Sequence, residues 1–357
     1  MALALLLGRR GLGRTWPNPA VGAVVVKDGI IVGRGWTQAG GRPHAEIEAL
    51  SRAGGAARGA TLYVTLEPCS HHGKSPPCAD AIVAAGLARV VSALEDPNPK
   101  VAGQGHARLL AAGIAVDVGV GAEEARRDHA GHITRIRDGR PHVMLKLAVS
   151  ADGKAGAAGR RPLAITGEAA RERVHLLRAH SDAVMIGIGT ALADDPMLTC
   201  RLPGMEKDSP VRIVLDGALR MPSDSRLART AQQTPVWVIC GDQAAQAAGE
   251  ALSVLGVVVL PAPQRRGRLD LAAVLALICG RGITRLMVEG GPTLAAALLS
   301  ADLIDEAVLL QSSKLVGADG VDALDGLPLT ALTRSPRLTS MRTEAIGADL
   351  CEVFERR

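Results

Sequence analysis

The sequence predicts an α/β protein made of two layered units. Runs of β-branched residues alternate with helix-like segments along the chain, a pattern typical of sheets covered by helices. The 357 residues leave room for two domains of about 150 residues each. Seven of the nine histidines precede Val143 and none follows His180, which indicates that the units carry different chemistry. A polar segment with Gly and Pro, residues 137–141, therefore marks the expected boundary between units 1–140 and 141–357.

Unit 1 is expected to contain a hairpin followed by alternating helices and strands. Asp28-Gly29 joins two β-branched runs and is typical of a two-residue hairpin turn. Residues 1–7 are apolar without a preceding basic segment, which favours part of an amphipathic helix over a signal peptide. Gly86 and Gly113 are stop signals for two helices. The expected strands are 20–26, 30–35, 61–66, 89–93 and 114–118, and the expected helices are 43–52, 78–85 and 105–112.

Unit 2 repeats the alternation over a longer stretch. An apolar, β-branched run follows the boundary directly and predicts the first strand of this unit. The expected strands are 143–149, 183–187, 211–215, 236–239, 257–260, 285–289 and 307–311, and the expected helices are 167–179, 269–280 and 292–301. The alternation predicts a second layered sheet.

Aromatic residues are unusually scarce, with three Trp, one Tyr and one Phe in the chain. The cores must therefore be built from Ala, Leu, Val and Ile, and a base-stacking nucleic-acid surface is disfavoured. The net charge is +5, and the arginines that dominate the basic residues form no tail. No apolar run approaches the roughly 18 residues of a membrane span. Six cysteines are no disulfide framework at this length, so we expect a cytoplasmic protein whose paired cysteines serve a metal or catalysis.

The sharpest chemical signal combines one histidine, one glutamate and two cysteines. His44, Cys69 and Cys78 supply three zinc ligands and leave the fourth position for water, as in catalytic zinc sites. Glu46 is then free to carry a proton from the attacking water to a ring nitrogen and departing ammonia. Residues two apart on a helix point about 200° apart, so His44 and Glu46 share a pocket only at the helix end, which Pro43 places at His44.

This signature resembles that of zinc deaminases, His-x-Glu followed by Pro-Cys-x-x-Cys, with one departure. Eight residues separate Cys69 from Cys78 in this chain. His71 or His72 within that insert could in principle replace a cysteine as a ligand. Loop histidines are more often exposed or in contact with substrate, so the two cysteines remain the preferred ligands.

The insert itself resembles the deaminase half of the bifunctional riboflavin-biosynthesis deaminase/reductase family, as do residues 15–22 and 96–99. The resemblance implies a cytidine-deaminase-like three-layer domain, with zinc on the one histidine and two cysteines and with Glu46 as proton shuttle. It also implies that Asn18 and Lys74 lie near the pyrimidine or its ribose phosphate. From the residues alone, Asn18 could equally be a turn residue and Lys74 a solvated loop charge.

A strand, a glycine turn and a helix follow one another over residues 286–294, an arrangement that can bind an anion and that is equally typical of a purely structural strand–helix turn. The turn is not the Gly-x-Gly-x-x-Gly fingerprint, and residues 187–190 also fail that pattern. Segments 145–153, 190–199 and 289–294 resemble the reductase half of the same family. The resemblance implies a dihydrofolate-reductase-like α/β domain whose NADPH is bordered by Val149, Thr190, Asp194, Gly291, Pro292, Thr293, Leu294, Ala295, Ala296 and Ala297.

The same resemblance places the substrate of unit 2 against Arg178, Leu198, Arg201 and Glu289. The two arginines suit a ribose phosphate, and Glu289 suits sugar hydroxyls or ring N–H groups. Lys146 would stabilise the charge that develops as the ribose opens and accepts hydride. A surface lysine at a strand end is an equally good interpretation of that residue.

We therefore expect a bifunctional, homo-oligomeric enzyme with a phosphorylated pyrimidine substrate and no nucleic-acid or membrane partner. The resemblance implies zinc-dependent deamination of 2,5-diamino-6-ribosylamino-4(3H)-pyrimidinone 5′-phosphate, then NADPH-dependent reduction of the ribosyl group to ribityl. Pro162 and Ala164 stand where relatives often carry Ser and Trp, which predicts a thinner cofactor wall. Two alternatives stay open: an active deaminase with a degenerate reductase-like domain that acts in dimerisation, and a nucleic-acid deaminase.

Overall fold

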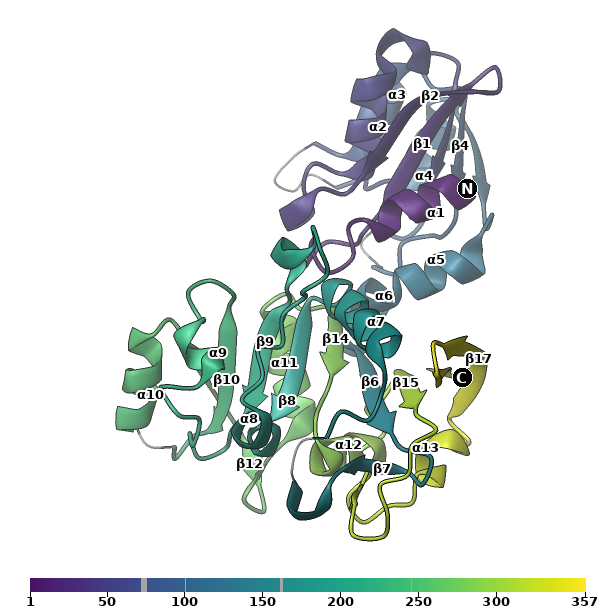
Figure 1. Cartoon of the computed structure of the whole chain (residues 1–357). Helices are drawn as coiled ribbons and strands as arrows, with labels where there is room; N and C mark the ends of the chain where they lie inside the picture. The colour runs from purple at the N-terminus through teal and green to yellow at the C-terminus, as the bar shows by residue number, and fades with distance from the viewer. Residues whose placement is uncertain (72–75, 100, 161–162, 245) are drawn as a thin grey trace. The chain divides into compact units, whose positions relative to one another are not determined.

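The computed structural model describes residues 1–71, 76–99, 101–160, 163–244 and 246–357 (Figure 1). The chain divides into two compact units, Met1–Arg140 and Pro141–Arg357. Each unit has its own sheet, its own helices and its own buried core. Among the described residues, no helix is long and apolar enough to cross a membrane.

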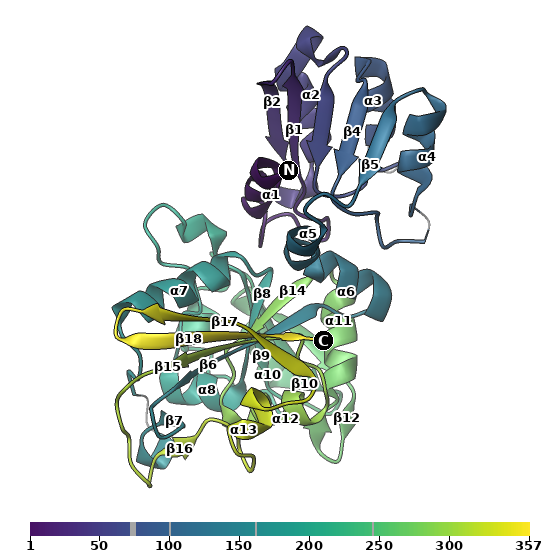
Figure 2. The same ribbon diagram turned by 90° about the vertical axis from the view of Figure 1, so that its right-hand side faces the viewer.

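Unit 1 is built on a five-stranded sheet with the order β2-β1-β3-β4-β5 (Figure 2). The first three of these strands pair antiparallel, and β3, β4 and β5 pair parallel. The predicted hairpin turn is present, with positive φ at both Asp28 and Gly29. The elements are β1 (Gly22–Lys27), β2 (Ile30–Trp36), β3 (Thr61–Val64), β4 (Arg89–Ser92), β5 (Ala115–Val118), α1 (Ala2–Arg9), α2 (Ala45–Ala53), α3 (Cys78–Ala85), α4 (Gln104–Ala111), α5 (Ala122–Asp128) and α6 (Ala130–Asp138).

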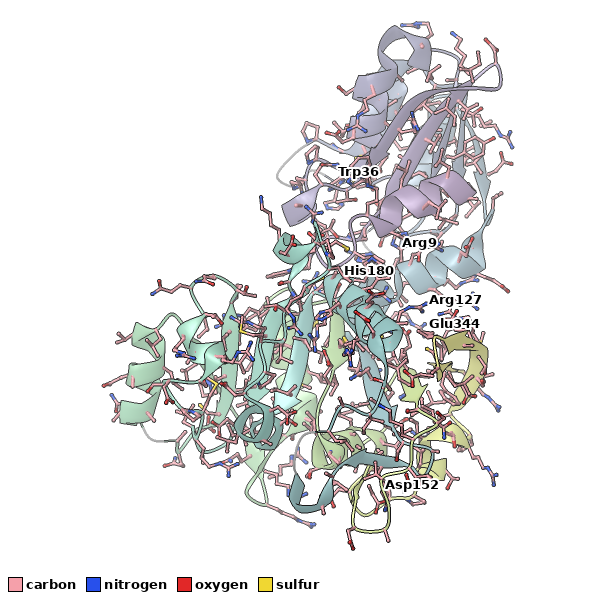
Figure 3. The ribbon with its side chains drawn as sticks, viewed as in Figure 1. Arg9, Trp36, Arg127, Asp152, His180 and Glu344 are labelled. Carbon is pink, nitrogen blue, oxygen red and sulfur yellow. The ribbon has the colours of Figure 1, made fainter. Side chains whose placement is uncertain are left out.

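Helices cover both faces of this sheet and make a three-layer unit. Ala23 and Val25 of β1 point to one face, and Val24 between them points to the other, as the two-residue period of a strand requires. The first face packs against α2, α3 and α4, and the second against α1. On that second side, Arg9 of α1, which is labelled in Figure 3, donates from Nε to Asp128 of α5 at 3.0 Å.

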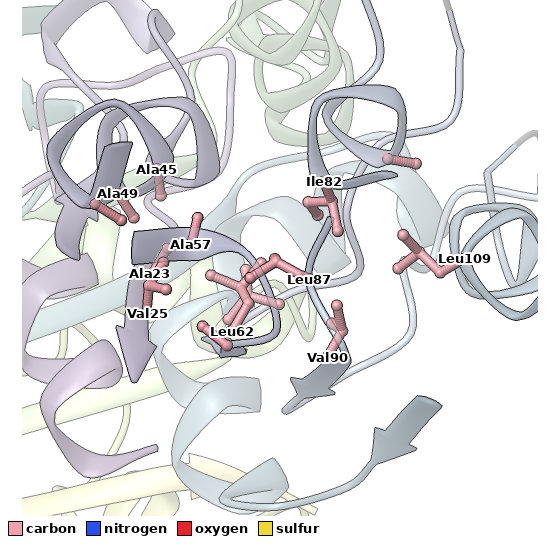
Figure 4. Packing of buried hydrophobic residues seen from close by; sticks show 14 of the residues in the cluster. Ala23, Val25, Ala45, Ala49, Ala57, Leu62, Ile82, Leu87, Val90 and Leu109 are labelled. Carbon is pink, nitrogen blue, oxygen red and sulfur yellow. The ribbon is translucent and has the colours of Figure 1, made fainter. Parts of the chain in front are cut away.

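Small side chains replace aromatic bulk in the main core of unit 1, which Figure 4 shows. Alanines such as Ala45 and Ala49 of α2 lie directly against the sheet and are fully buried. Gly35 of β2 allows this close packing, because a Cβ at that position would lie 2.3 Å from the Ala45 carbonyl oxygen. Helix α2, which carries the zinc-type motif, is therefore held unusually close to β2.

Unit 2 is built on a nine-stranded sheet with the order β11-β10-β9-β8-β14-β6-β15-β18-β17. The strands from β11 to β15 pair parallel, and β15, β18 and β17 pair antiparallel. The large strands are β6 (His142–Val149), β8 (Ala183–Gly187), β9 (Val211–Leu215), β10 (Val236–Gly241), β11 (Val258–Ala262), β14 (Arg285–Val288), β15 (Glu306–Gln311), β17 (Leu338–Ile346) and β18 (Asp349–Arg356). Two small sheets pair β7 (Lys154–Gly156) with β16 (Val321–Asp322) and β12 (Gln264–Arg265) with β13 (Arg268–Leu269).

The helices of unit 2 connect the parallel strands and pack against the sheet in separate hydrophobic clusters. Val174 of α7 packs against Met287 and Val308, whereas Leu227 and Leu252 pack against Val214 in a separate cluster. The helices are α7 (Glu168–Ala179), α8 (Ile188–Asp194), α9 (Arg226–Arg229), α10 (Gln246–Val254), α11 (Leu271–Gly280), α12 (Pro292–Ser300) and α13 (Thr330–Thr333).

The chain returns to the centre of this sheet after building one side of it. It runs outward from β8 to β11, then places β14 between β8 and β6. In parallel sheets, ligands bind outside the carboxyl ends of strands at such a reversal. The ends of β6, β8 and β14 therefore position the candidate site of unit 2.

Candidate functional site

Unit 1 brings the three predicted zinc ligands together at the starts of two helices. His44 is the N-cap of α2, and Cys78 is the first residue of α3. The Nδ1 atom of His44 lies 3.7 Å from Sγ of Cys69 and 3.3 Å from Sγ of Cys78. The three ligand atoms all lie within 4.8 Å of one another. The chain thus gathers one nitrogen and two sulfur donors in one place.

The arrangement of these donors fits a zinc ion. Tetrahedral zinc with bonds of about 2.3 Å to sulfur and 2.0–2.1 Å to nitrogen separates N and S ligands by about 3.6 Å. The two N···S distances here, 3.7 and 3.3 Å, are close to that value. The backbone N–H of Cys78 donates to Sγ of Cys69 at 3.2 Å. Hydrogen bonds from the Cys78 and His44 side chains outweigh burial and lower the pKa of Cys69 to about 4, which favours the metal-binding thiolate.

Glu46 lies in the first turn of α2, two residues after His44. Its side chain is buried with 3% exposure. Burial raises the pKa of Glu46 to about 7. A carboxyl group with this pKa can accept and release protons near neutral pH. The helix starts at Ala45, so His44 and Glu46 reach the same site from its end, as predicted.

The remaining predicted residues of unit 1 are only partly described. The Asn18 side chain is half-buried and donates from Nδ2 to the Gly41 carbonyl oxygen at 2.9 Å. His71 is exposed and lies outside the group of three ligands. Lys74 and His72 lie outside the described residues.

Unit 2 gathers a buried ionic cluster from three different elements. Glu289 follows β14 and receives two bonds from Arg178 of α7, Nε to Oε1 at 2.5 Å and Nη2 to Oε2 at 2.9 Å. Lys146 of β6 places its Nζ 3.7 Å from Oε2 of the same carboxylate. Burial opposes ionisation of Glu289, but the two cations outweigh it and hold its pKa below the ordinary value. Two positive charges thus surround one negative charge.

Further residues extend the positive character of this cluster. Burial and the nearby charge of Arg178 lower the pKa of Arg201, which is exposed. Two neighbouring guanidinium groups favour a bound anion such as a phosphate. Leu198 is buried at 3% exposure and belongs to a hydrophobic core cluster that includes Val184 and Val214.

His175 is a member of this region that the sequence reasoning missed. Its Nδ1 lies 3.1 Å from the Thr199 carbonyl oxygen, which also accepts from Nη1 of Arg178 at 3.1 Å. Burial and the charge of Arg178 lower the pKa of His175. The signal was available, because a residue three positions before Arg178 shares its face of helix α7.

Most of the predicted cofactor residues lie in the first two turns of α12 or in contact with its start. Gly291 is its N-cap and Pro292 its first residue. The Gly291 N–H donates to Oγ1 of Thr190 in α8 at 3.1 Å, so the two predicted segments meet. Thr293 is exposed and donates to Asp325 at 2.8 Å. The other members divide into buried residues and more accessible ones: Val149, Leu294, Ala295 and Ala296 are buried, Ala297 is half-buried and Asp194, the last residue of α8, is exposed.

The two departures from the family pattern stand in the segment before α7. Ala164 is exposed, and its carbonyl oxygen lies 3.5 Å from Nζ of Lys314. Pro162 lies outside the described residues. The described part of this segment therefore presents a small, exposed side chain at position 164.

Comparisons with known proteins agree with both halves. The family described as "Cytidine and deoxycytidylate deaminase zinc-binding region" matches residues 1–94, and "RibD C-terminal domain" matches residues 141–352. The riboflavin biosynthesis protein RibD of Escherichia coli (strain K12) is 42% identical, with 98% of this chain and 97% of the relative covered. RibD of Aquifex aeolicus (strain VF5) is also 42% identical, with 100% and 97% covered.

Comparison with solved structures points to the same family. Acinetobacter baumannii RibD, form 1, superimposes with a TM-score of 0.88 at 35% identity, covering 100% of this chain and 97% of that one. A deaminase/reductase from Thermotoga maritima gives a TM-score of 0.87 at 34% identity with the same coverage. Unit 1 has the cytidine-deaminase-like fold, and unit 2 has the dihydrofolate-reductase-like fold of the RibD C-terminal domain. The chain therefore belongs to the RibD family of riboflavin biosynthesis proteins.

Proposed function

We propose that residues 1–140 are the zinc-dependent deaminase and residues 141–357 the NADPH-dependent reductase of a bifunctional enzyme of riboflavin biosynthesis. The observation that carries the proposal is the meeting of His44, Cys69 and Cys78 at two helix starts, with Glu46 buried beside them. The full-length likeness to RibD proteins supports both activities. The substrate is a phosphorylated pyrimidine, 2,5-diamino-6-ribosylamino-4(3H)-pyrimidinone 5′-phosphate.

In the deaminase, His44, Cys69 and Cys78 would hold the metal. Zinc in such a site lowers the pKa of water and so supplies the nucleophile. Glu46 takes one proton from the attacking water and passes it to the ring nitrogen, and it then carries the second proton, from the hydroxyl group formed on C2, to the leaving amino group. The water oxygen bonds to C2, the C2–N bond breaks, and ammonia leaves.

The rest of the deaminase site would orient the substrate. Asn18 is fixed through its Nδ2 bond to the Gly41 carbonyl, which leaves its side-chain oxygen directed elsewhere. We assign Asn18 and Lys74 to the pyrimidine and its ribose phosphate. The amide group of Asn18 can pair with ring N–H groups, and a lysine provides the charge that a phosphate requires.

In the reductase, the start of α12 fits the phosphates of NADPH. Gly290 and Gly291 have no side chains to obstruct an anion, and the dipole at a helix N-terminus favours negative charge. NADPH supplies a hydride. We assign Val149, Thr190, Asp194 and residues 291–297 to the border of this cofactor.

The ionic cluster of unit 2 would bind and polarise the substrate. Arg178 and Arg201 provide charge for the ribose phosphate, and Glu289 accepts from sugar hydroxyls or ring N–H groups. Leu198 forms an apolar border. Lys146, 3.7 Å from Glu289, stabilises the charge that develops as the ribose ring opens and its carbon accepts hydride.

A coupled assay on the diaminopyrimidine phosphate tests both halves. Absorbance and product mass are followed with and without NADPH, for the wild type and for Glu46→Gln. We expect the variant to retain zinc, to lose deamination and to keep NADPH oxidation on the deaminated substrate. Normal deamination by Glu46→Gln would contradict the assigned proton shuttle. Absence of NADPH oxidation by the wild type would support the degenerate-reductase alternative, which the intact cluster around Glu289 disfavours.

We also propose that the enzyme is cytoplasmic and homo-oligomeric. All six cysteines are free thiols, which supports a reducing compartment. Strand β17 lies at the end of the nine-stranded sheet and exposes Met341, which supports self-association along this edge. Light scattering coupled to size-exclusion chromatography tests the second point, and a monomer would reject it.

A further inference from the structure

We propose that Glu67 is a positioning residue for the zinc ligand Cys69, which stands two residues after it; the inference rests on the proposed deaminase site. The sequence motif contains Glu67, but neither the metal nor the proton transfer uses it. Its side chain is fully buried, with 0% exposure. A buried carboxylate is costly unless its oxygens are hydrogen-bonded, so its partners reveal what it does.

Those partners are four backbone N–H groups from one stretch of chain. Oε2 accepts from Asp96 and from Gly103, each at 3.0 Å. Oε1 accepts from Gly105 at 2.8 Å and from His106 at 3.3 Å. The last two donors lie in the first turn of α4, where the helix dipole stabilises a negative charge. One side chain thus ties the loop after β4 and the start of α4 to the segment that leads into Cys69.

The backbone at Pro68, just before Cys69, packs tightly against α4. A Cβ at Gly105 would lie 2.1 Å from the carbonyl oxygen of Pro68, the residue between Glu67 and Cys69. Arg108 of α4 also donates to the Ser70 carbonyl oxygen at 3.4 Å. The turn that carries the thiolate is therefore held against α4 on both sides of Cys69.

The position of Cys69 also affects the next ligand, Cys78. Its Sγ accepts the backbone N–H of Cys78 at 3.2 Å, so a shift of the turn moves one ligand and removes a hydrogen bond from another. In metal sites, groups that orient the ligands commonly change metal affinity or activity by about 10–100-fold when they are removed. Glu67 acts here through the backbone instead of through a direct bond to the ligand atom.

The same carboxylate is not itself a metal ligand. Glu67, Glu95 and His106 lie close enough together to suggest a second cation site. Both oxygens of Glu67 already accept two N–H groups each, and Nε2 of His106 lies 2.8 Å from Oγ of Ser92. This geometry favours an anchor for the backbone over a cation ligand.

The test replaces Glu67 by Gln in the full chain and loads the protein with Co²⁺ as a spectroscopic probe. An amide places an NH₂ donor against two of the four N–H groups, so the turn must move. We expect a shifted cobalt ligand-field spectrum, Zn²⁺ affinity or deamination kcat about 10- to 100-fold lower, and unchanged NADPH oxidation on the deaminated substrate. The matched control is Asp117→Asn, which removes an exposed ion pair with Arg89 in the same unit and should leave the spectrum unchanged.

A second variant keeps the result decisive if Glu67→Gln does not fold. Gly105→Ala retains the carboxylate but pushes on the Pro68 carbonyl, and it should shift the cobalt spectrum in the same way. Wild-type spectra and wild-type kcat in a folded variant would overturn the proposal, whatever the change in melting temperature. If the wild type binds Co²⁺ but does not deaminate, the proposed function fails, while a spectral shift in the variants still supports the positioning role.

Discussion

Removal of the Glu289 carboxylate should destabilise unit 2 and flatten its response to acid. In Glu289→Gln, Arg178 and Lys146 lose the only carboxylate that the cluster provides, in a place where Glu289 and Arg178 are 7% and 12% exposed. Breaking a buried pair by removing one partner costs about 3–5 kcal/mol. The Gln oxygen retains one bond to Arg178, so we expect a loss near the lower end, about 3 kcal/mol at pH 7.

The pH dependence has a definite sign. The pKa of Glu289 in the folded protein lies below its ordinary value, because Arg178 and Lys146 outweigh the effect of burial. The stabilisation is therefore complete above the unfolded-state pKa of about 4.3 and is lost as the pH falls through the folded-state value. The stability difference between wild type and Glu289→Gln should accordingly shrink in acid.

Urea unfolding followed by tryptophan fluorescence measures this difference. Trp237 of β10 is 7% exposed and reports on unit 2 when Trp16 and Trp36 are replaced by Phe. The unfolding free energy is compared at pH 7 and at several acidic pH values. Equal stability of Glu289→Gln and its parent at pH 7, with the same acid dependence, would refute the reasoning.

The control is an ion pair in the same unit whose carboxylate is exposed. Lys154 binds Asp322 at 2.7 Å, and the Asp322 side chain is 68% exposed. Exposed pairs contribute about 0–1 kcal/mol. Asp322→Asn should therefore change the unfolding free energy little, and a loss as large as that of Glu289→Gln would show that burial is not the cause.

Two further predictions concern unit 1. Removal of metal by a chelator should abolish deamination and leave NADPH oxidation on the deaminated substrate intact. Re-addition of Zn²⁺ should restore deamination. Loss of both activities on chelation would contradict the assignment of the two reactions to separate sites. Gly35→Val should destabilise unit 1 by about 2 kcal/mol or more, because its Cβ would lie 2.3 Å from the Ala45 carbonyl oxygen. Differential scanning calorimetry measures the loss, and Gly55→Ala, where a Cβ meets no atom within 4 Å, should be neutral.

The sequence predicted the elements that have strong local signals. Helix α3 has its predicted bounds because Gly86 adopts the left-handed conformation that ends it. Strands β8 and β9 also have their predicted bounds, since both consist mainly of buried apolar residues, with Arg212 as the one charged member of β9. The hairpin turn at Asp28-Gly29 follows from the positive φ that these residue types tolerate.

Elements with weak apolar patterns were missed. Helices α5 and α6 are rich in charged and polar residues and lie at the end of unit 1, where only one side of each is covered. Strand β17 has an almost entirely exposed central portion, so its burial does not alternate clearly. Helix α8 starts within a glycine-containing segment that resembles a loop. In each case tertiary packing outweighs local preference.

The residues of the candidate sites also divide into those that the sequence reveals and those that only the fold reveals. His44, Glu46 and the two cysteines are recognisable because their chemistry depends on side-chain type and spacing. The role of Glu67 is invisible in the sequence, because its partners are backbone N–H groups of residues 29 to 39 positions away. Any amino acid can offer such a group, so only the folded chain shows which ones are gathered around this carboxylate.

The junction between Arg140 and Pro141 has a consequence for the amounts of the two activities. Both units lie on one polypeptide, so each ribosome that completes the chain delivers one deaminase site and one reductase site. The ratio of sites is fixed at synthesis, whatever the level of expression. At a given NADPH concentration, the steady-state ratio of deaminated intermediate to deaminase substrate then depends on the two rate constants and not on the amount of enzyme, so a substitution that slows the reductase raises that ratio.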